Sequence, residues 1–327
     1  MILSFLSVLF CCTAVWAGPY APRYDLSLAD QLFEEFVKTH QRQYGSEQER
    51  QMRFSIFKDN LKTINEQNLE SKTAVFGITK FSDLTHEEFL QKQTGLRFPE
   101  EYQDRCQWMP AVTSDFPESF DWRDHNVVTR VKDQGDCGSC WAFSAIGCLE
   151  SQYALRYNKL KEFSEQQLVD CDDDDFGCEG GLMEDAFLWL INNGGVMSEE
   201  DYPYSGKDDM CQFNETKVQT TIYECGRIDG KNETLLAKQL VTSGPLAIGI
   251  NADAIGFYNG GIVDHCHSHK MNHGVLLVGY GEEKGTPYWI VKNSWGPDWG
   301  EDGYFRIIRN KNCNALTEYI LKPTNFY

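Results

Sequence analysis

Basic residues are scarce in this sequence of 327 residues, and their scarcity excludes one class of partner. The chain has 30 Lys and Arg against 49 Asp and Glu, which gives a formal net charge of −19 at pH 7. Binding to nucleic acid requires basic surface that displaces counterions from the phosphates. We therefore expect no nucleic-acid partner. We expect most carboxylates, including the run from Asp172 to Asp175, to be solvated surface.

Long apolar runs are missing after the first residues of the chain. Met1–Cys12 is apolar except for two serines, and small residues precede Gly18, which is the pattern of a secretory signal peptide spanning residues 1–17. No Lys or Arg precedes this apolar core, and the run is shorter than the roughly 20 residues that a membrane-spanning helix needs. We expect the secretory pathway, with a lysosomal or extracellular destination, and no membrane span in the mature protein.

Cysteine, in contrast, is abundant. Twelve cysteines in a chain with a leader indicate the oxidising environment in which disulfides persist. Cys11 and Cys12 belong to the signal, and Cys106 lies well before the other nine cysteines, which begin at Cys137. The number that remains is odd, so at least one thiol is expected to be unpaired.

One of these cysteines lies at the start of a predicted helix. In the segment Gln134–Ser144, Cys140 precedes the apolar run Trp141–Tyr157, and Ser139 is placed to act as the N-cap. The unpaired N–H groups and positive end of a helix lower the pKa of a thiol and favour the thiolate. Cys140 is therefore a candidate nucleophile that needs a base.

The chain supplies a base and an orienting partner at a known spacing. A Cys-Gly-Ser-Cys-Trp sequence ends at Trp141, and His273 and Asn293 follow Cys140 by about 130 and 150 residues. This combination resembles papain-type cysteine peptidases of the cathepsin L and cathepsin F kind. The resemblance extends from about residue 28 to the C-terminus.

The resemblance implies a role for each of these residues. Cys140 would attack the scissile carbonyl as a thiolate, and His273 would protonate the leaving amine. Asn293 would orient the imidazole, and Trp295 would shield that hydrogen bond from water. The side-chain amide of Gln134 and the backbone N–H of Cys140 would stabilise the oxyanion. The expected activity is that of a cysteine endopeptidase that needs no cofactor.

The N-terminal third resembles an inhibitory propeptide. Six residues at steps of four or three form one stripe of a helix expected from residue 47 to about 69: Glu49, Arg53, Phe57, Asn60, Ile64 and Asn68. They match the pro-region signature of cathepsin L-like zymogens. The segment Gly77–Asp83 is similar to a second pro-region motif of the family, with Thr79 where Asn is usual. As a hypothesis, Glu49 and Asp83 pair with basic groups such as Arg53, and their protonation at low pH loosens the inhibitor.

These motifs divide the expected zymogen into three parts. Phe116–Arg123 resembles the mature N-terminus of the family, and the linker Met109–Phe116 is the expected processing site. The signal peptide would be followed by a propeptide at 18–115 and a peptidase domain at 116–327. The resemblance also implies that the propeptide tail, about residues 90–112, runs backwards through the cleft.

Periodicity predicts an α+β fold with helices early and strands late. Helical patterns cover residues 28–44, 47–69, 141–157, 164–169, 182–192 and 233–243, and strand-like runs cover 246–250, 275–280, 288–292 and 304–309. The resemblance implies a papain-like fold of two lobes with a helical pro-domain. The helical lobe would span about 123–225 and the β-barrel-like lobe about 226–327.

Substrate-binding residues follow from the same resemblance. Gly180 and Gly181 match the segment whose second glycine pairs with the substrate backbone. Five residues match the pocket for the side chain that precedes the scissile residue, namely Leu182, Met183, Gly249, Met271 and Gly274. They predict a preference for Leu, Val or Phe. Glu318 matches the pocket floor, where a carboxylate would also accept Arg, unless a gap shift places it outside. The absence of an occluding insertion between Cys178 and Cys211 favours an endopeptidase over a dipeptidase.

The resemblance also pairs six cysteines. It implies the disulfides Cys137–Cys178, Cys171–Cys211 and Cys266–Cys313. Cys148 and Cys225 are left over, either as buried free thiols or as a bridge of their own.

Parts of the sequence also fit other functions. Cys137 and Cys140 form a Cys-x-x-Cys pair, which is typical of a thiol–disulfide oxidoreductase, but no βαβ pattern precedes it. An inactive homologue acting as a binding module is disfavoured because every catalytic part is present. The sequence His265-Cys-His-Ser-His269 has the residues of a metal site, but the resemblance assigns its cysteine to a disulfide, so no metal is expected.

The remaining expectations concern partners and modification. Asn214 and Asn232 begin glycosylation sequons. The expected partners are protein and peptide substrates, the chain's own propeptide and, by resemblance, cystatin-type inhibitors. The protein is expected to be a monomer.

Overall fold

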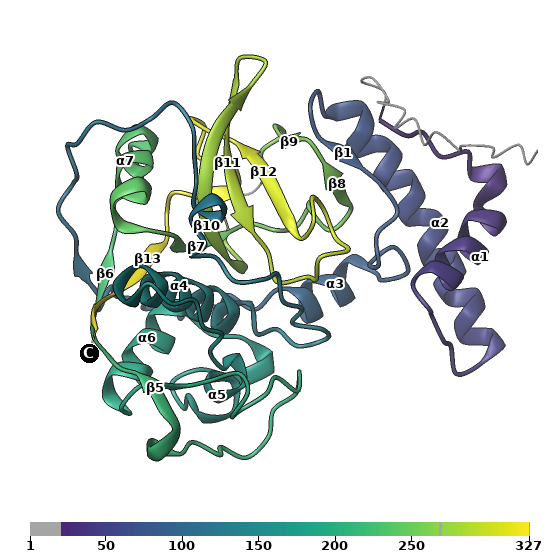
Figure 1. Cartoon of the computed structure of the whole chain (residues 1–327). Helices are drawn as coiled ribbons and strands as arrows, with labels where there is room; N and C mark the ends of the chain where they lie inside the picture. Colours follow the sequence, from purple (N-terminus) through teal and green to yellow (C-terminus); the bar gives the residue numbers. More distant parts are fainter. Residues whose placement is uncertain (1–20, 268–269, 327) are drawn as a thin grey trace, which may run out of the picture.

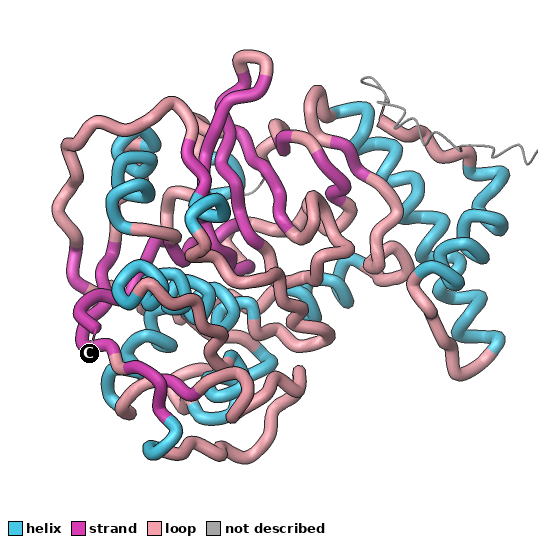
Figure 2. Tube along the Cα trace, in the orientation of Figure 1, coloured by secondary structure: helices cyan, strands magenta, loops and turns pink. Residues whose placement is uncertain are grey.

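The structure is a computed structural model that describes residues 21–267 and 270–326. A small helical unit comes first, followed by a mainly helical lobe and a lobe built on strands (Figure 1). Figure 2 shows most of the strands gathered in the upper part, with helix α7 beside them at the upper left and the other helices below and at the right. The predicted α+β class is confirmed. The expected signal peptide, residues 1–17, lies outside the described residues.

The helices agree with the predicted positions except for one that was missed. They are α1 (Ala29–Thr39), α2 (Glu47–Glu70), α3 (His86–Gln93), α4 (Cys140–Tyr157), α5 (Glu165–Cys171), α6 (Met183–Asn192) and α7 (Glu233–Ser243). Short 3₁₀ turns occur at Leu26–Leu28, Trp122–His125, Gly177–Glu179, Glu215–Lys217 and Cys313–Ala315. Helix α3 is the missed one, because its eight residues are too few to show a clear helical period.

The strands include the four predicted ones and several short additions. They are β1 (Val75–Phe76), β2 (Gln107–Trp108), β3 (Phe120–Asp121), β4 (Val196–Met197), β5 (Val218–Thr220), β6 (Ile222–Arg227), β7 (Leu246–Ile250), β8 (Tyr258–Gly260), β9 (Ile262–Val263), β10 (His273–Glu283), β11 (Thr286–Lys292), β12 (Tyr304–Ile308) and β13 (Ile320–Phe326). The main sheet has the order β2-β6-β13-β7-β10-β11-β12-β9, with β3 also paired to β10. The N-terminal region joins this lobe twice, because β2 pairs with β6 and β1 pairs with β8.

One stripe of helix α2 holds the N-terminal unit together. Its apolar members Phe57 and Ile64 are fully buried, and Phe57 packs against Phe33 of α1. Its asparagines bond to backbone instead. Asn60 donates to two carbonyls of the loop before α3, at 2.9 and 2.8 Å, and Asn68 exchanges two hydrogen bonds of 2.8 Å with strand β1. The stripe therefore both builds the core and fixes the chain that follows it.

The ion pairs of this unit differ from the expected ones. Arg53 pairs with Glu88 of α3, and Asp83 pairs with Arg42 at 3.1 Å. Glu49 accepts a backbone hydrogen bond of 2.7 Å from the turn before α2. The expectation that Asp83 pairs with a basic group is therefore confirmed, although that group is Arg42. Arg53 as the named partner is wrong, because Arg53 pairs with Glu88, which also closes the capping box of α3 and lay outside the motifs.

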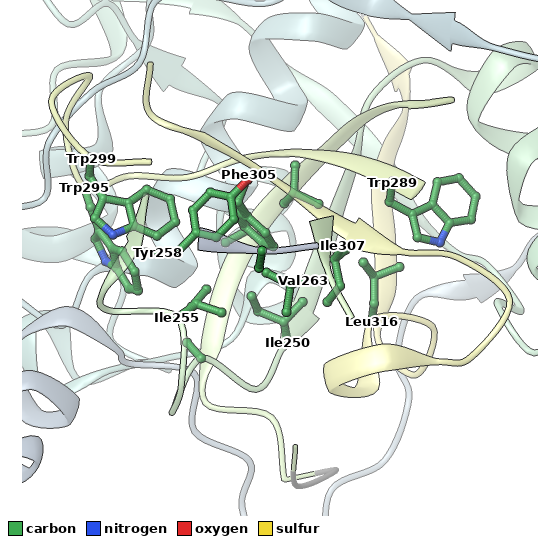
Figure 3. Close-up of a cluster of buried hydrophobic side chains, with 14 of the residues drawn as sticks. Ile250, Ile255, Tyr258, Val263, Trp289, Trp295, Trp299, Phe305, Ile307 and Leu316 are labelled. Atoms are coloured by element: carbon green, nitrogen blue, oxygen red, sulfur yellow. The ribbon is translucent and has the colours of Figure 1, made fainter. Parts of the chain in front are cut away.

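Aromatic side chains fill the strand lobe close to the cleft. Figure 3 shows Trp295, Trp299, Tyr258 and Phe305 in one buried cluster. The rings of Trp295 and Trp299 meet edge to face with centroids 4.8 Å apart, which is a favourable aromatic geometry. In the part of the chain that the structure describes, no helix is both long and apolar enough to cross a membrane.

Helix α4 occupies the boundary between the two lobes. It packs against strand β10 of one lobe and against helices α5 and α6 of the other. Every residue from 140 to 154 is buried. This burial explains why its sequence shows an almost continuous apolar and small-residue run, and it fixes the helix N-terminus at the cleft.

Candidate active site

Cys140 is the first residue of helix α4 and is fully buried. Ser139 occupies the N-cap position, as expected, but its side chain makes no capping hydrogen bond. The Ser139 hydroxyl bonds to the Tyr204 hydroxyl at 2.6 Å instead. The N–H groups at the helix N-terminus, which lie beside the thiol, therefore receive no hydrogen bond from the N-cap side chain.

Strand β10 brings His273 to this thiol from the other lobe. The backbone N–H of Gly274 donates to the Sγ atom of Cys140 at 3.3 Å. A Cβ atom at position 274 would lie 3.0 Å from the Cys140 carbonyl oxygen, so only glycine fits without a shift. The close approach of β10 to α4 therefore depends on Gly274.

His273 is oriented by Asn293 and covered by Trp295. Its Nε2 atom lies 2.8 Å from Oδ1 of Asn293, and the rings of His273 and Trp295 stack with centroids 4.7 Å apart. Among the described residues, Nδ1 of His273 has no hydrogen-bond partner. One ring nitrogen is thus held by the amide, and the other is available to the thiol.

The closed form holds both reactive groups neutral. Burial raises the pKa of the Cys140 thiol to about 12, although the backbone N–H groups of Gly274, Gly95 and Trp141 act in the opposite direction. Burial lowers the pKa of His273 to about 4, against the hydrogen bond to Asn293. Burial in the closed form therefore opposes the thiolate that the helix N-terminus favours, because loss of water outweighs the helix N-terminus.

Gln134 lies at the same site and is also fully buried. Its Oε1 atom accepts a hydrogen bond of 2.6 Å from the Ser294 hydroxyl, which fixes the amide. Its Nε2 atom donates to the carbonyls of Cys137 and Gln93, at 2.9 and 3.3 Å. Gln93 belongs to the N-terminal region, so a donor of the expected oxyanion site is engaged by the chain's own backbone.

The segment after α3 continues through the cleft. Gly181 donates its N–H to the carbonyl of Gly95 at 2.8 Å and accepts from the N–H of Arg97 at 3.2 Å, so Leu96 and Gly181 form a parallel bridge. A Cβ atom at position 95 would overlap the carbonyl oxygen of Gly138. The tail therefore passes directly over the start of helix α4, held by the backbone of Gly181.

The side chain of Leu96 enters an apolar pocket. Gly249 lies at its wall, because a Cβ there would be 2.8 Å from Leu96, 3.1 Å from Met271 and 3.3 Å from Tyr319. Leu182 and Met183 are buried in the same cluster, and a Cβ on Gly274 would be 3.1 Å from the Met183 sulfur. The structure thus places Gly249 and Met271 beside a leucine of the chain itself, while Leu182 and Met183 are buried in the same cluster and Gly274 lies next to Met183.

Glu318 lies elsewhere. Its side chain is exposed and accepts a hydrogen bond of 2.9 Å from Asn312. The next residue, Tyr319, is fully buried beside Gly249, and its ring meets that of Phe98 at 4.9 Å. This geometry favours the alternative in which Glu318 is outside the pocket. Counting five residues from Cys313 reaches the exposed Glu318 and not its buried neighbour Tyr319.

The disulfides include one that was not anticipated. The bridges Cys137–Cys178, Cys171–Cys211 and Cys266–Cys313 are present as the resemblance implied. Cys225 is bonded to Cys106, so a Cys148–Cys225 bridge does not form, and Cys148 is a buried free thiol. Because Cys137 is bonded to Cys178 and Cys140 is free, these two do not form the redox pair of an oxidoreductase.

The candidate metal and glycan positions have ordinary surroundings. Cys266 of the histidine-rich segment is in a disulfide, and His269 lies outside the described residues. Within the described ranges, no group of three or more His, Cys, Asp or Glu is arranged to hold a metal ion. Asn214 and Asn232 are exposed, and their Oδ1 atoms cap short helical segments.

Comparison with known proteins identifies the family of the chain. A model of the papain family of cysteine proteases matches residues 116–322, and one of the cathepsin propeptide inhibitor domain matches residues 33–89. A viral cathepsin of Adoxophyes honmai nucleopolyhedrovirus is 44% identical over 309 residues, covering 91% of this chain and 92% of the relative. A viral cathepsin of Heliothis zea nuclear polyhedrosis virus is 45% identical over 315 residues, covering 90% and 85%.

A solved structure resembles the whole arrangement. Digestive procathepsin L2 from the larval midgut of Tenebrio molitor superposes with a TM-score of 0.85 at 37% identity, covering 90% of this chain and 99% of that one. The papain-like fold, the peptidase domain and the inhibitory propeptide are therefore all established. This chain belongs to the papain family of cysteine proteases, as a zymogen whose propeptide is of the cathepsin inhibitor type.

Proposed function

We propose that the zymogen matures into an endopeptidase that acts through Cys140, His273 and Asn293. Two contacts carry the proposal: one joins His273 to Asn293, and the other joins the next residue, Gly274, to Cys140. Asn293 binds Nε2 at 2.8 Å, and Gly274 holds the Cys140 sulfur at 3.3 Å, so Nδ1 remains as the nitrogen for the thiol. Departure of the propeptide readmits water, and the proton then moves from Cys140 to His273.

The steps of hydrolysis follow from this pairing. The Cys140 thiolate attacks the scissile carbonyl, and the oxyanion receives hydrogen bonds from the Cys140 backbone N–H and the Gln134 amide. The imidazolium of His273 then protonates the leaving amine, and water hydrolyses the acyl-enzyme by the reverse sequence. Trp295 keeps water from the bond between His273 and Asn293 throughout.

The second subsite should prefer an apolar side chain. Support comes from Leu96, which already occupies the pocket beside Gly249 and Met271. Tyr319, rather than Glu318, bounds this pocket, so the charge needed to attract Arg is not directed into it. We propose a preference for Leu, Val or Phe over Arg, and backbone pairing of the substrate with Gly181.

Maturation would follow the domain plan inferred from sequence. We propose a signal peptide at 1–17, a propeptide at 18–115 and a mature domain from residue 116, with the cut in the linker Met109–Phe116. Residues 110–115 belong to no helix or strand and are mostly exposed, as a processing site should be. We further propose a secretory route to the lysosome or the cell exterior, glycosylation at Asn214 and Asn232, a monomeric state and inhibition by cystatin-type proteins.

A fluorogenic assay tests the activity and the preference together. Protein that has been processed in acid with a reductant and separated from its propeptide should cleave dipeptide coumarylamides with Leu or Phe in the second subsite at least tenfold faster than the matched Arg compound. The Cys140→Ser variant should be inactive. Equal rates for Leu and Arg would refute the pocket assignment, and no activity in fully processed protein would refute the catalytic assignment.

The same assay can test Glu318 alone. Glu318→Ala should leave the ratio of Leu to Arg cleavage unchanged. A selective loss of Arg cleavage would instead place the carboxylate in the pocket.

A further inference from the structure

A disulfide joins the propeptide to the peptidase domain. Cys106 immediately precedes strand β2 of the propeptide tail, and Cys225 lies in strand β6, with their Cα atoms 5.0 Å apart. Strand β2 pairs in parallel with β6, so backbone hydrogen bonds hold the two cysteines in register. The bridge is thus a part of the sheet and connects two segments that processing would separate.

Buried polar contacts fix the tail next to this bridge. Glu184, which is fully buried, accepts hydrogen bonds from the backbone N–H groups of Arg105 and Cys106 at 2.9 and 2.7 Å, and from the Tyr102 hydroxyl at 2.9 Å. Arg227 of β6 pairs with Asp104 at 2.8 Å. These contacts form a docking site for the tail that lies beyond the substrate cleft.

The position of the bridge along the chain decides what a single cut can release. Leu96 fills the pocket, and ten residues later Cys106 forms the bridge. The processing linker begins only after Cys106, so both Leu96 and Cys106 lie on the N-terminal side of the cut. We propose that cleavage between Met109 and Phe116 leaves the propeptide covalently attached through Cys106–Cys225. The enzyme then stays inhibited until a second event breaks this connection.

The connection matters because it keeps the inhibitor concentrated at the cleft. A segment tethered by a short flexible linker has an effective concentration of the order of millimolar. A propeptide released by the cut would instead be diluted into the compartment. Weakening of the noncovalent contacts, for example at acid pH, would therefore free an untethered inhibitor long before it freed a tethered one.

Two events can break the connection. A thiol reductant can transfer two electrons and two protons to the bridge, giving the Cys106 and Cys225 thiols while two reductant thiols become a disulfide. Alternatively, a second cut within residues 97–105 frees the inhibitory part and leaves a stub on Cys225. Cys106 and Cys225 are only 5% and 4% exposed, so the tail must loosen before a reductant reaches them.

Intact-mass measurement tests the tether without requiring activity. The Cys140→Ser zymogen would be cut in the linker by limited pepsin digestion at pH 4 without any thiol, and the cut verified by mass. The expected species is the peptidase domain plus a propeptide fragment that contains Cys106, which separates into two species after addition of a phosphine reductant. A peptidase domain free of Cys106 before reduction would overturn the proposal. The inference rests on the proposed linker cut, but its test cannot be confused with failure of catalysis.

A second measurement tests the inhibition. The zymogen with Cys140 intact would be digested in the same way, and the rate at which an epoxide inhibitor labels Cys140 would be compared with that in the Cys106→Ser/Cys225→Ser variant. The wild-type product should label at least tenfold more slowly, and reductant should abolish the difference. Product trimmed within 97–105 should label as fast as the variant. Equal labelling rates for untrimmed wild type and variant would overturn the proposal. If the variant fails to fold, the labelling rates of the wild-type product with and without reductant still decide the question.

Discussion

Arg53 of helix α2 and Glu88 of helix α3 form a two-point ion pair, with N···O distances of 2.6 and 2.9 Å. The hydrogen bonds from Arg53 lower the pKa of Glu88 to about 2. Because this folded-state pKa lies below the ordinary value, the stabilisation is present above about pH 4 and is lost only as the pH falls through about 2. The pair should therefore stay intact at pH 4.5, and acid release of the propeptide should start elsewhere.

Substitution of Glu88 tests this assignment. Glu88→Gln should lower the hydrogen-exchange protection of helix α2 about tenfold at both pH 7 and pH 4.5, because Arg53 loses its charged partner. In wild type, α2 protection should be equal at the two pH values. Asp59→Asn, which removes an exposed pair with Lys62, is the control and should change little. Wild-type protection that falls at pH 4.5 to the level of the variant would contradict the assignment.

The glycine at position 95 should be required for inhibition. A Cβ there overlaps the Gly138 carbonyl at the start of helix α4, so Gly95→Ala should displace the tail from the cleft. We predict that an epoxide inhibitor labels Cys140 in the uncut Gly95→Ala zymogen about tenfold or more faster than in wild type. Thr113→Ala, in the exposed linker, should label at the wild-type rate. Slow labelling of both variants would show that inhibition does not depend on a glycine beside the Gly138 carbonyl.

The candidate active-site residues and several helices and strands could be predicted from the sequence. Cys140, His273 and Asn293 were found because the family signature fixes both their types and their spacing. Helix α7 and strand β7 were predicted to the residue, because Gly244 and Pro245 separate a helical pattern from a short, continuously apolar run. These features are encoded locally.

The features that sequence analysis missed depend on distant partners. Cys106 and Cys225 are 119 residues apart, and no spacing rule links them. The preference of Arg53 for Glu88 depends on the angle between two helices, and the presence of Tyr319 in the pocket depends on a turn with left-handed residues at 312 and 314. The neutral state of Cys140 depends on burial by the tail, which a helix-terminus argument does not include.

A buried cation network beneath the active site should carry much of the stability of the helical lobe. Lys132 binds the carboxylates of Glu150 and Glu165 at 2.8 and 2.6 Å, and all three side chains are at most 9% exposed. Lys132→Met would leave two carboxylates buried without their cation. We predict a loss of about 3 to 5 kcal/mol in the free energy of unfolding, measured by urea denaturation.

A surface lysine provides the control for this change. Lys159 is exposed, so Lys159→Met should alter the free energy of unfolding by no more than about 0.5 kcal/mol. If the two variants unfolded at the same urea concentration, the network would have no special role.

Two carboxyls near Gly181 should make the peptidase domain more stable in acid. The expectation that the run from Asp172 to Asp175 is solvated surface is wrong for its two end residues, because Asp172 is buried and Asp175 is only partly exposed. Burial, and then the like charge of its neighbour, raises the pKa of Asp175, and burial also raises the pKa of Asp172. Groups with raised pKa values hold their protons in the folded state, so their stabilisation is full at low pH and is lost as the pH rises above about 4. Asp175→Asn should therefore raise the stability at pH 8 by about 1 to 3 kcal/mol and leave it unchanged at pH 4.

Thermal unfolding of the mature domain between pH 4 and pH 8 measures this effect. The exposed neighbour Asp173 gives a matched variant, Asp173→Asn, which should follow the wild-type pH profile. A wild-type domain whose stability rises steadily with pH would contradict the prediction.

Because Cys148 is buried, the number of thiols that react in this protein depends on how the zymogen was opened. The Cys148 sulfur is fully buried and donates to the Pro245 carbonyl at 3.3 Å, and burial raises its pKa to about 12, so it stays silent toward thiol reagents in the folded protein. Cys140 is equally silent while the tail covers it. The closed zymogen should then titrate no thiol, and an enzyme freed by trimming of the tail one. An enzyme freed by reduction should titrate two after separation from its propeptide, which carries Cys106. A colorimetric thiol count of the separated enzyme would thus distinguish the two routes of opening.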